Sequence, residues 1–421
     1  MASALQREDR PVAESLCLDD LLDILRDLAL GGRLIARPGD GRVHVRGVTL
    51  DSTDVAPGDL FAGLPGRLRH GADYAGRAAE AGAVALLSDR PDLSLPSLVV
   101  EHPRQVLGAL SARLYGDPSH ALSVYGVTGA NGKTSTNHLL AAGLKAAGHR
   151  VGLAGSLETR VPGEVGRPSE RTTAEAPSLQ RLLARTRQAG GTDMVLEVSS
   201  HALELARVNG TRFRVAVFTN LSPDHLDLHG DLERYYAAKA SLFTPDRCEH
   251  AVVNVGDPHG HRLANEMLCP LSTFTMGSEP ADWSARTIRA DAGGTRFRLR
   301  GPGCDREVRL RLLGAHQADN AVAAAVALAV GGVDFGAALR GMENLASVHR
   351  RKPPQRESRN AARRRRSRRT EACSGLGSRR TRPATRAPSG GIRRPSRRRG
   401  RGRRTRCGPT ADLRRRLPPL R

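Results

Sequence analysis

The sequence predicts an α/β fold with a mixed α/β N-terminal region, a central region built on a mainly parallel sheet covered by helices, and a tail without a core. Between residues 120 and 348, β-like runs alternate with helical stretches, a pattern typical of a parallel sheet with helices on both faces. Beyond residue 350 the sequence is Arg-rich and has no hydrophobic period, so it cannot bury enough apolar surface to order itself. We expect domains at 1–115 and 116–348 and a disordered tail at 349–421.

The N-terminal region shows β-like alternation in "VHVRGVTLDSTDVAPGDLFAGLPG", interrupted by Pro-Gly pairs at 57–58 and 65–66. The following "GADYAGRAAEAGAVALLSD" indicates a helix, a turn and a strand. A total of 421 residues is compatible with two or three domains.

The central region contains four predicted strands, Val124–Thr128, Met194–Val198, Val215–Asn220 and Ala251–Val255. The stretch "SLQRLLARTRQAG" indicates a helix ended by Gly-Gly at 190–191, and "HQADNAVAAAVALAVGG" indicates a second. "ARTIRADAGGTRFRLRG" and "REVRLRLL" predict an antiparallel addition with a hairpin turn at Gly293-Gly294.

The stretch "GVTGANGKTST", residues 126–136, lies between a predicted strand and a predicted helix. In this context we expect backbone N–H groups to bind phosphate oxygens, Lys133 to contact the β- and γ-phosphates, and the Thr134 hydroxyl to hold Mg²⁺. The strict phosphate-loop pattern requires glycine at position 127, where this chain has valine. The alternative is an ordinary strand–turn–helix with a surface lysine.

The formal charge of +23 belongs to the tail. Residues 350–421 contain 28 of the 66 Lys and Arg and only three acids, so the rest of the chain carries about −2. The six cysteines include no CxxC pair, and no apolar run approaches the ~20 residues of a membrane helix. With no signal-peptide core at the N-terminus, we expect a cytoplasmic protein with no membrane partner.

Several stretches resemble the Mur ligases, ATP-dependent amide-forming enzymes of peptidoglycan precursor synthesis, and the MurE type in particular. Besides the loop, these are "VTLDSTDVAPGDLFAGLPG", "RTTAEAPSLQRLL", "EVSSHALELARVNG", "FTNLSPDHLDLHG", "YYAAKASLF" and "LLGAHQADNAVAA", in the family's order. The resemblance implies a uridine-nucleotide-binding N-terminal domain and a central domain that binds ATP and Mg²⁺. It also implies that an acyl phosphate of the substrate carboxylate is attacked by an amine.

The resemblance also assigns the site residues. ATP is expected on Gly129, Ala130, Asn131, Gly132, Lys133, Thr134 and Ser135, with Asn320 at the adenine. The metal ligands are expected to be Thr134, Glu197, His225 and Lys239, the last as a carbamate; Lys133, Lys239 and His225 form the catalytic set. Read alone, a strand-end acid, a loop histidine or a helical lysine is often only solvated.

The substrate, UDP-N-acetylmuramoyl-L-alanyl-D-glutamate, is expected at Leu50 and Ser52 in the first domain. Thr172, Thr173, Ser199 and Arg207 match positions that contact its sugar-peptide part, where the planar arginine fork suits a carboxylate or pyrophosphate. The alternative for each of these is a helix cap or a surface residue. Diaminopimelate is the expected amino acid, lysine remains open, and we expect a monomer.

The resemblance stops after "ALRGMENLASV". A MurE-type chain would continue with "PGRME" and "DYAHTP" into a Rossmann-like C-terminal domain, whereas this one reads "HRRKPPQRESRNAARRRRSRR". We expect a frameshift that replaces this domain and impairs the ligase. The alternatives are an unusual regulatory or pseudoenzyme tail and a genuine basic tail that binds nucleic acid through phosphates. The last alternative suggests a rival function, a non-enzymatic NTP-binding protein.

Overall fold

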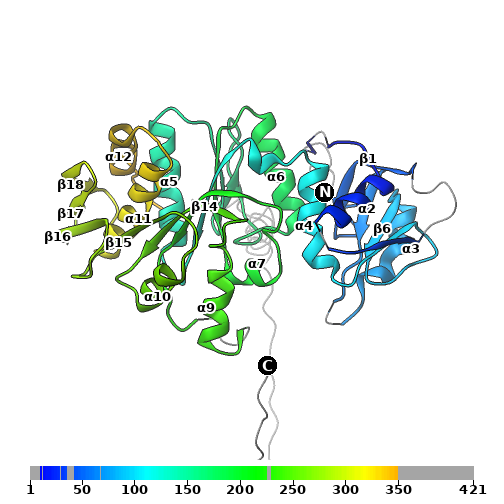
Figure 1. Ribbon diagram of the computed structural model, residues 1–421. Helices are drawn as coiled ribbons and strands as arrows, with labels where there is room; N and C mark the ends of the chain where they lie inside the picture. The colour runs from blue at the N-terminus through cyan, green and yellow to red at the C-terminus, as the bar shows by residue number, and fades with distance from the viewer. Residues whose placement is uncertain are drawn as a thin grey trace, which may run out of the picture. The chain divides into compact units, whose positions relative to one another are not determined.

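The computed structural model describes residues 10–11, 13–28, 30–35, 42–66, 68–224 and 229–348. The predictions made for the tail at 349–421 lie outside these residues. The described part contains two principal sheets, and Figure 1 labels several of the helices and strands.

The first sheet lies in the N-terminal region and has the strand order β2-β7-β6-β5-β4. Its neighbours β4 to β7 are parallel, and β2 is antiparallel to β7. The strands are β2 (Arg33–Ile35), β4 (Gly47–Thr49), β5 (Asp59–Ala62), β6 (Ala85–Ser88) and β7 (Ser97–Val99), and a separate pair consists of β1 (Leu16–Cys17) and β3 (His44–Val45).

The helices of this region are α2 (Leu18–Asp27), η2 (Gly71–Tyr74), α3 (Ala75–Glu80) and α4 (Pro103–Leu114), followed by η3 (Pro118–His120). The apolar face of α2 is buried through Leu18, Leu21, Leu22 and Leu25, and α4 packs against α6 (Ala176–Gln188). The mixed α/β character predicted for the region is confirmed, while its boundary at residue 115 stays a prediction.

The central sheet has eleven strands in the order β11-β10-β9-β12-β8-β13-β14-β15-β16-β17-β18. From β9 to β16 all neighbours are parallel. These strands are β9 (Val151–Ala154), β12 (Asp193–Glu197), β8 (Ser123–Thr128), β13 (Phe213–Phe218), β14 (Cys248–Asn254), β15 (Leu271–Thr275) and β16 (Trp283–Asp291). All four predicted strands are found within one to three residues of their expected starts.

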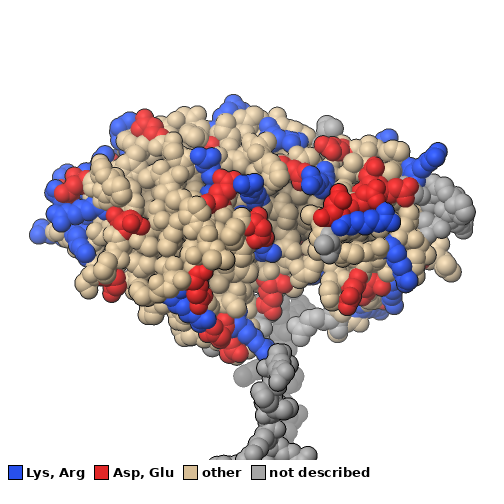
Figure 2. All heavy atoms as spheres, in the orientation of Figure 1, with Lys and Arg blue, Asp and Glu red and all other residues tan. Residues whose placement is uncertain are grey.

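Both edges of this sheet are antiparallel. β10 (Glu158–Arg160) and β11 (Arg167–Pro168) extend one edge, and β17 (Gly294–Gly301) and β18 (Cys304–Leu310) extend the other. The predicted hairpin is confirmed, with Gly294 opening β17 at φ 127°. On the face of Figure 2, basic and acidic side chains are interspersed over the described residues.

Helices cover both faces of the central sheet. α5 (Lys133–Ala146), α11 (His316–Val330) and α12 (Phe335–Glu343) pack on one face around Val127, Val195 and Val217. α6, α9 (Leu232–Ala240) and α10 (Pro258–Glu266) pack on the other face around Met194, Leu196 and Phe218. The short α7 (Ser200–Glu204) follows β12. This doubly covered sheet brings the carboxyl ends of β8, β9, β12 and β13 to one edge.

Val127 explains why the loop departs from the strict pattern. It lies in β8, is 0% exposed and belongs to the core beneath α5 and α11. A glycine here removes a buried side chain and loosens a central strand.

We predict that Val127→Gly, although it creates the strict phosphate-loop pattern, lowers the free energy of unfolding by roughly 2–4 kcal/mol. Urea unfolding followed by circular dichroism measures this. Val165→Gly, at a position that is 88% exposed, serves as the control and should change little. An unchanged urea midpoint for Val127→Gly would contradict this account of the loop.

Candidate functional site

The loop at 129–132 joins the end of β8 to the start of α5. Gly129 and Gly132 have φ values of 146° and 88°, which favour glycine. A Cβ on Gly129 would lie 1.9 Å from Oγ1 of Thr219, and one on Gly132 would lie 2.2 Å from Oδ1 of Asn320. Both glycines are therefore required by conformation and by space, and Asn320 of α11 lies directly against the turn.

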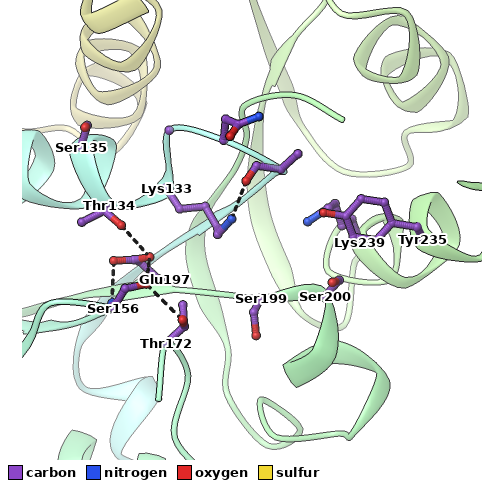
Figure 3. Close-up of a pocket in the computed structure, with 13 residues that line it drawn as sticks. Lys133, Thr134, Ser135, Ser156, Thr172, Glu197, Ser199, Ser200, Tyr235 and Lys239 are labelled. Carbon is purple, nitrogen blue, oxygen red and sulfur yellow. Dashed lines mark hydrogen bonds between the residues drawn. The ribbon is translucent and has the colours of Figure 1, made fainter. Parts of the chain in front are cut away.

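Two lysine side chains converge on this loop. Nζ of Lys133 donates to the carbonyl oxygens of Gly129 and Ala130 at 2.8 and 2.9 Å. Nζ of Lys239 donates to the same Gly129 oxygen at 2.8 Å and lies 4.5 Å from the centre of the Tyr235 ring. The loop is thus flanked by two ammonium groups from different helices, as Figure 3 shows.

Burial lowers the pKa of both lysines because an ammonium group loses hydration inside the protein. For Lys239, which is 1% exposed, burial and then the neighbouring Lys133 lower the pKa to about 7, while Asp224 acts in the opposite direction. For Lys133 the pKa is lowered by burial, against the opposing effect of Glu197 and Asp224. An anion held between the two ammonium groups would favour their charged forms.

The carboxylate of Glu197 lies opposite the lysines, at the carboxyl end of β12. It accepts hydrogen bonds from the Thr134 hydroxyl at 3.1 Å, and from the backbone N–H and the hydroxyl of Ser156 at 2.9 and 3.0 Å. Thr134 and Glu197 therefore place two hard oxygen donors side by side, the kind of ligand that Mg²⁺ prefers. Among the described residues, no three His, Cys, Asp or Glu side chains gather into a metal-binding group.

The sugar-peptide candidates lie next to this carboxylate. Oγ1 of Thr172 is 3.0 Å from the Ser156 hydroxyl. Thr173 is buried and donates to the backbone oxygen of Glu197 at 2.8 Å. The Thr173 hydroxyl also accepts from the backbone N–H of Ser199 at 3.1 Å.

Arg207 is almost completely buried beside these residues. It forms an ion pair with Glu175 at 2.7 Å and donates to the Thr173 carbonyl at 3.4 Å. Arg104 of α4 shares Glu175 at 3.1 Å. One carboxylate, that of Glu175, thus holds two guanidinium groups, and an anionic ligand could replace this carboxylate as their partner.

A cavity of about 330 Å³ collects most of these side chains. The predicted residues that line it are Ala130, Asn131, Gly132, Lys133, Thr134, Ser135, Thr172, Glu197, Ser199 and Lys239. Three further lining residues were not predicted: Ser156, which follows β9, Ser200 and Tyr235. Gly129, Thr173, Arg207 and Asn320 lie just behind this lining, through the contacts given above.

Of the remaining predicted residues, Leu50 and Ser52 do not line the cavity. Leu50 and Ser52 follow β4, where Arg181 of α6 donates to the Val48 carbonyl at 3.3 Å. His225 lies outside the described residues. The roles assigned to all three stay predictions.

A glycine-rich turn between a central parallel strand and a helix that opens with Lys-Thr defines a P-loop α/β protein. The chain belongs to the Mur ligase family. The family model described as Mur ligase middle domain matches residues 127–328, and the model described as Mur ligase family, catalytic domain, matches residues 44–115.

Curated relatives include two UDP-N-acetylmuramoyl-L-alanyl-D-glutamate--2,6-diaminopimelate ligases. The one from Streptomyces avermitilis is 43% identical over 327 residues, covering 76% of this chain and 64% of the relative. The one from Corynebacterium glutamicum is 44% identical over 320 residues, covering 73% and 62%. The chain therefore spans less than two thirds of the length of these relatives.

A solved structure of a UDP-N-acetylmuramoyl-L-alanyl-D-glutamate--2,6-diaminopimelate ligase superposes with a TM-score of 0.68 at 27% identity. The superposition covers 79% of this chain and 67% of that one. The MurF ligase from Thermotoga maritima, solved with ADP, shares the fold at a TM-score of 0.51 and 22% identity. The predicted α/β architecture is confirmed by these likenesses.

In the part of the chain that the structure describes, no helix is both long and apolar enough to cross a membrane.

We predict that Lys239→Met stabilises the protein at pH 7, because burying an ammonium group costs more than burying a thioether. The folded pKa of about 7 lies below the ordinary 10.5, so the unfolded chain binds more protons between these values. The penalty is full below pH 7 and disappears as pH approaches 10.5. Thermal melts in carbonate-free buffer should show a gain on the order of 1–3 kcal/mol at pH 7 that shrinks with rising pH.

Lys145→Met, on an exposed part of α5, is the control and should give a smaller change. A lower melting temperature for Lys239→Met than for the wild type at pH 7 would mean that the Lys239 ammonium group stabilises the fold. The pKa of Lys239 would then not be lowered by burial.

Proposed function

We propose that this chain carries the ATP site of an amide-forming ligase that adds diaminopimelate to UDP-N-acetylmuramoyl-L-alanyl-D-glutamate in peptidoglycan precursor synthesis. The observation that carries the proposal is the convergence of Lys133, Lys239, Thr134 and Glu197 on one polar cavity at the carboxyl end of a parallel sheet. Similarity to diaminopimelate ligases at 43–44% identity supports the substrate. The reaction belongs to the cytoplasm, where ATP and the uridine nucleotide are available.

In this proposal the backbone N–H groups of residues 130–134 and the Lys133 ammonium hold the triphosphate of ATP. Thr134 and Glu197 would hold Mg²⁺, which would supply positive charge to the phosphoryl group being transferred. The substrate carboxylate attacks the γ-phosphorus, ADP leaves, and the resulting acyl phosphate is then attacked by an amine with loss of phosphate. Asn320, which lies against Gly132, is close to where the adenine is expected.

Lys239 has two states that suit this chemistry. As an ammonium group it would pair with a phosphate oxygen. As the neutral amine favoured by its low pKa, it can add to carbon dioxide with loss of a proton, giving the carbamate expected from the family. Carbon NMR of protein incubated with isotope-labelled bicarbonate tests the second state. A carbamate resonance that is present in the wild type and absent from Lys239→Met supports it, and a wild-type spectrum without this resonance excludes it.

The sugar-peptide part of the substrate is proposed to lie along Thr172, Thr173, Ser199 and Arg207, with Leu50 and Ser52 at the uridine. The buried Arg207 guanidinium supplies the positive charge that a peptide carboxylate requires. The rival function, an NTP-binding protein with a nucleic-acid-binding tail, is not favoured, because the similarity to ligases extends over 73–76% of the chain. The monomeric state stays a prediction.

The proposal is tested by trapping the acyl phosphate. With ATP, Mg²⁺, the UDP-linked dipeptide and hydroxylamine, we expect a hydroxamate to form, because hydroxylamine is small enough to need no amino-acid pocket. Lys133→Ala should reduce its rate by roughly 100-fold, since a preorganised cation on the phosphate is lost. Colorimetric detection with iron(III) measures the product. Lys145→Ala should match the wild type, and no ATP-dependent hydroxamate from the wild-type chain would overturn the proposal.

A second assay, with diaminopimelate in place of hydroxylamine and phosphate release as the measurement, tests the prediction that the ligase is impaired. We expect little or no ATP-dependent phosphate release, because residues 349–421 show no resemblance to the family's amine-binding runs. Robust tripeptide formation by the purified chain would show that this prediction is wrong while leaving the ATP site in place.

A further inference from the structure

A second group of side chains lies on the side of the cavity opposite the phosphate loop, and one of them, Ser200, reaches the cavity. Ser200 opens α7 and lines the cavity, and Glu204 ends the same helix. Because the two residues are four positions apart, their side chains lie on one face of the helix. His229 follows 25 residues after α7 and is buried against that face, 4% exposed.

These three side chains are joined in a line. Nε2 of His229 is 3.0 Å from the Ser200 hydroxyl, and Nδ1 of His229 is 3.1 Å from Oε2 of Glu204. A carboxylate can only accept, so the imidazole proton lies on Nδ1 and Nε2 accepts from the serine. The order is serine, histidine, carboxylate, with each contact within hydrogen-bond reach.

We propose that Ser200, His229 and Glu204 form an acyl-transfer triad, with Ser200 as a nucleophile toward activated carboxylic esters that enter the cavity. The geometry meets the requirements of nucleophilic catalysis: the nucleophile contacts its base, and the base is oriented by a third group. None of these residues has a part in the ATP site described above. The inference does not need the ligase function, although an acyl phosphate formed in the cavity would belong to the same chemical class.

The bonds made and broken balance without a further reactant except water. The Ser200 oxygen bonds to the ester carbonyl carbon, and its proton passes to Nε2 of His229. The C–O bond to the alcohol breaks, and the alcohol leaves with that proton. Water then attacks the acyl-serine, gives its proton to His229 and releases the carboxylic acid, and Ser200 regains its hydrogen.

Two neighbours can stabilise the negative charge on the carbonyl oxygen. Tyr235 lines the cavity together with Ser200, and burial raises the pKa of its hydroxyl to about 12, so this hydroxyl keeps a proton to donate. The ring of Tyr235 also contacts the His229 ring, with centroids 4.9 Å apart. The Lys239 ammonium lies over the same Tyr235 ring, 4.5 Å from its centroid.

The chain contains a built-in comparison. His250 on β14 contacts the hydroxyl of Ser272 on β15 at the same distance, 3.0 Å. In the described part of the chain, His250 has no carboxylate ion pair, and Ser272 does not line the cavity of Ser200. If a Ser–His contact alone were sufficient for reactivity, Ser272 would react as well as Ser200.

The test is covalent labelling of the full chain with diisopropyl fluorophosphate, without ATP or Mg²⁺, followed by peptide mass spectrometry. We expect the label on Ser200 and not on Ser272. Hydrolysis of p-nitrophenyl acetate should fall to the protein-free background in Ser200→Ala and stay at the wild-type rate in Ser272→Ala. His229→Gln should reduce Ser200 labelling by roughly 100-fold. Glu204→Gln should have a smaller effect, because this carboxylate is 47% exposed.

Wild-type protein without a label on Ser200, or Ser200→Ala with unchanged esterase activity, would overturn the proposal. If His229→Gln fails to fold, as thermal melts would show, the wild-type labelling and Ser200→Ala decide the question. Because no ATP is present, failure here leaves the hydroxamate result of the proposed function unaffected, and the reverse also holds.

Discussion

The whole site depends on one carbonyl oxygen, that of Gly129, which accepts from two lysine ammonium groups at 2.8 Å each. Two like charges this close to each other and largely removed from water oppose folding. The arrangement persists because the surrounding fold over-determines it: Lys133 is held by the start of α5, and Lys239 by the buried face of α9 against Tyr235. Such a concentration of positive charge favours a polyanion, and among the described residues the carboxylates that act on these ammonium groups are Glu197 and Asp224.

The strands determine where this charge can be placed. Because β8, β9, β12 and β13 are parallel neighbours, their carboxyl ends bring the loop, Ser156, Glu197 and Asn220 to one edge of the sheet. Asn220 accepts from the backbone N–H of Asn131 at 2.9 Å and so supports the turn from the next strand. The loop is therefore fixed by its neighbours on both sides as well as by its own glycines.

Much of this could be predicted from the sequence, and the limits have physical causes. Lys133, Thr134 and Glu197 were predictable because each follows or opens an element with a clear signal, a glycine-rich turn or the end of a buried strand. Ser156 was not, since a serine after β9 has no pattern of its own and becomes important only through its two contacts with Glu197. Ser200, Glu204 and His229 were missed for the same reason: their relation is tertiary, and "SSHALE" by itself indicates only a capped helix.

The triad and the phosphate loop share a cavity but use different sides of it, and this separation has a consequence for chemistry. The loop side is cationic and suits a phosphate leaving group. The α7 side carries the Ser200 hydroxyl, whose proton can pass to Nε2 of His229. An activated acyl group formed between them would face attack by Ser200 unless an amine reached it first. In the proposed ligase the amine would therefore have to reach the acyl phosphate before Ser200 or water does, because hydrolysis would release phosphate without forming an amide.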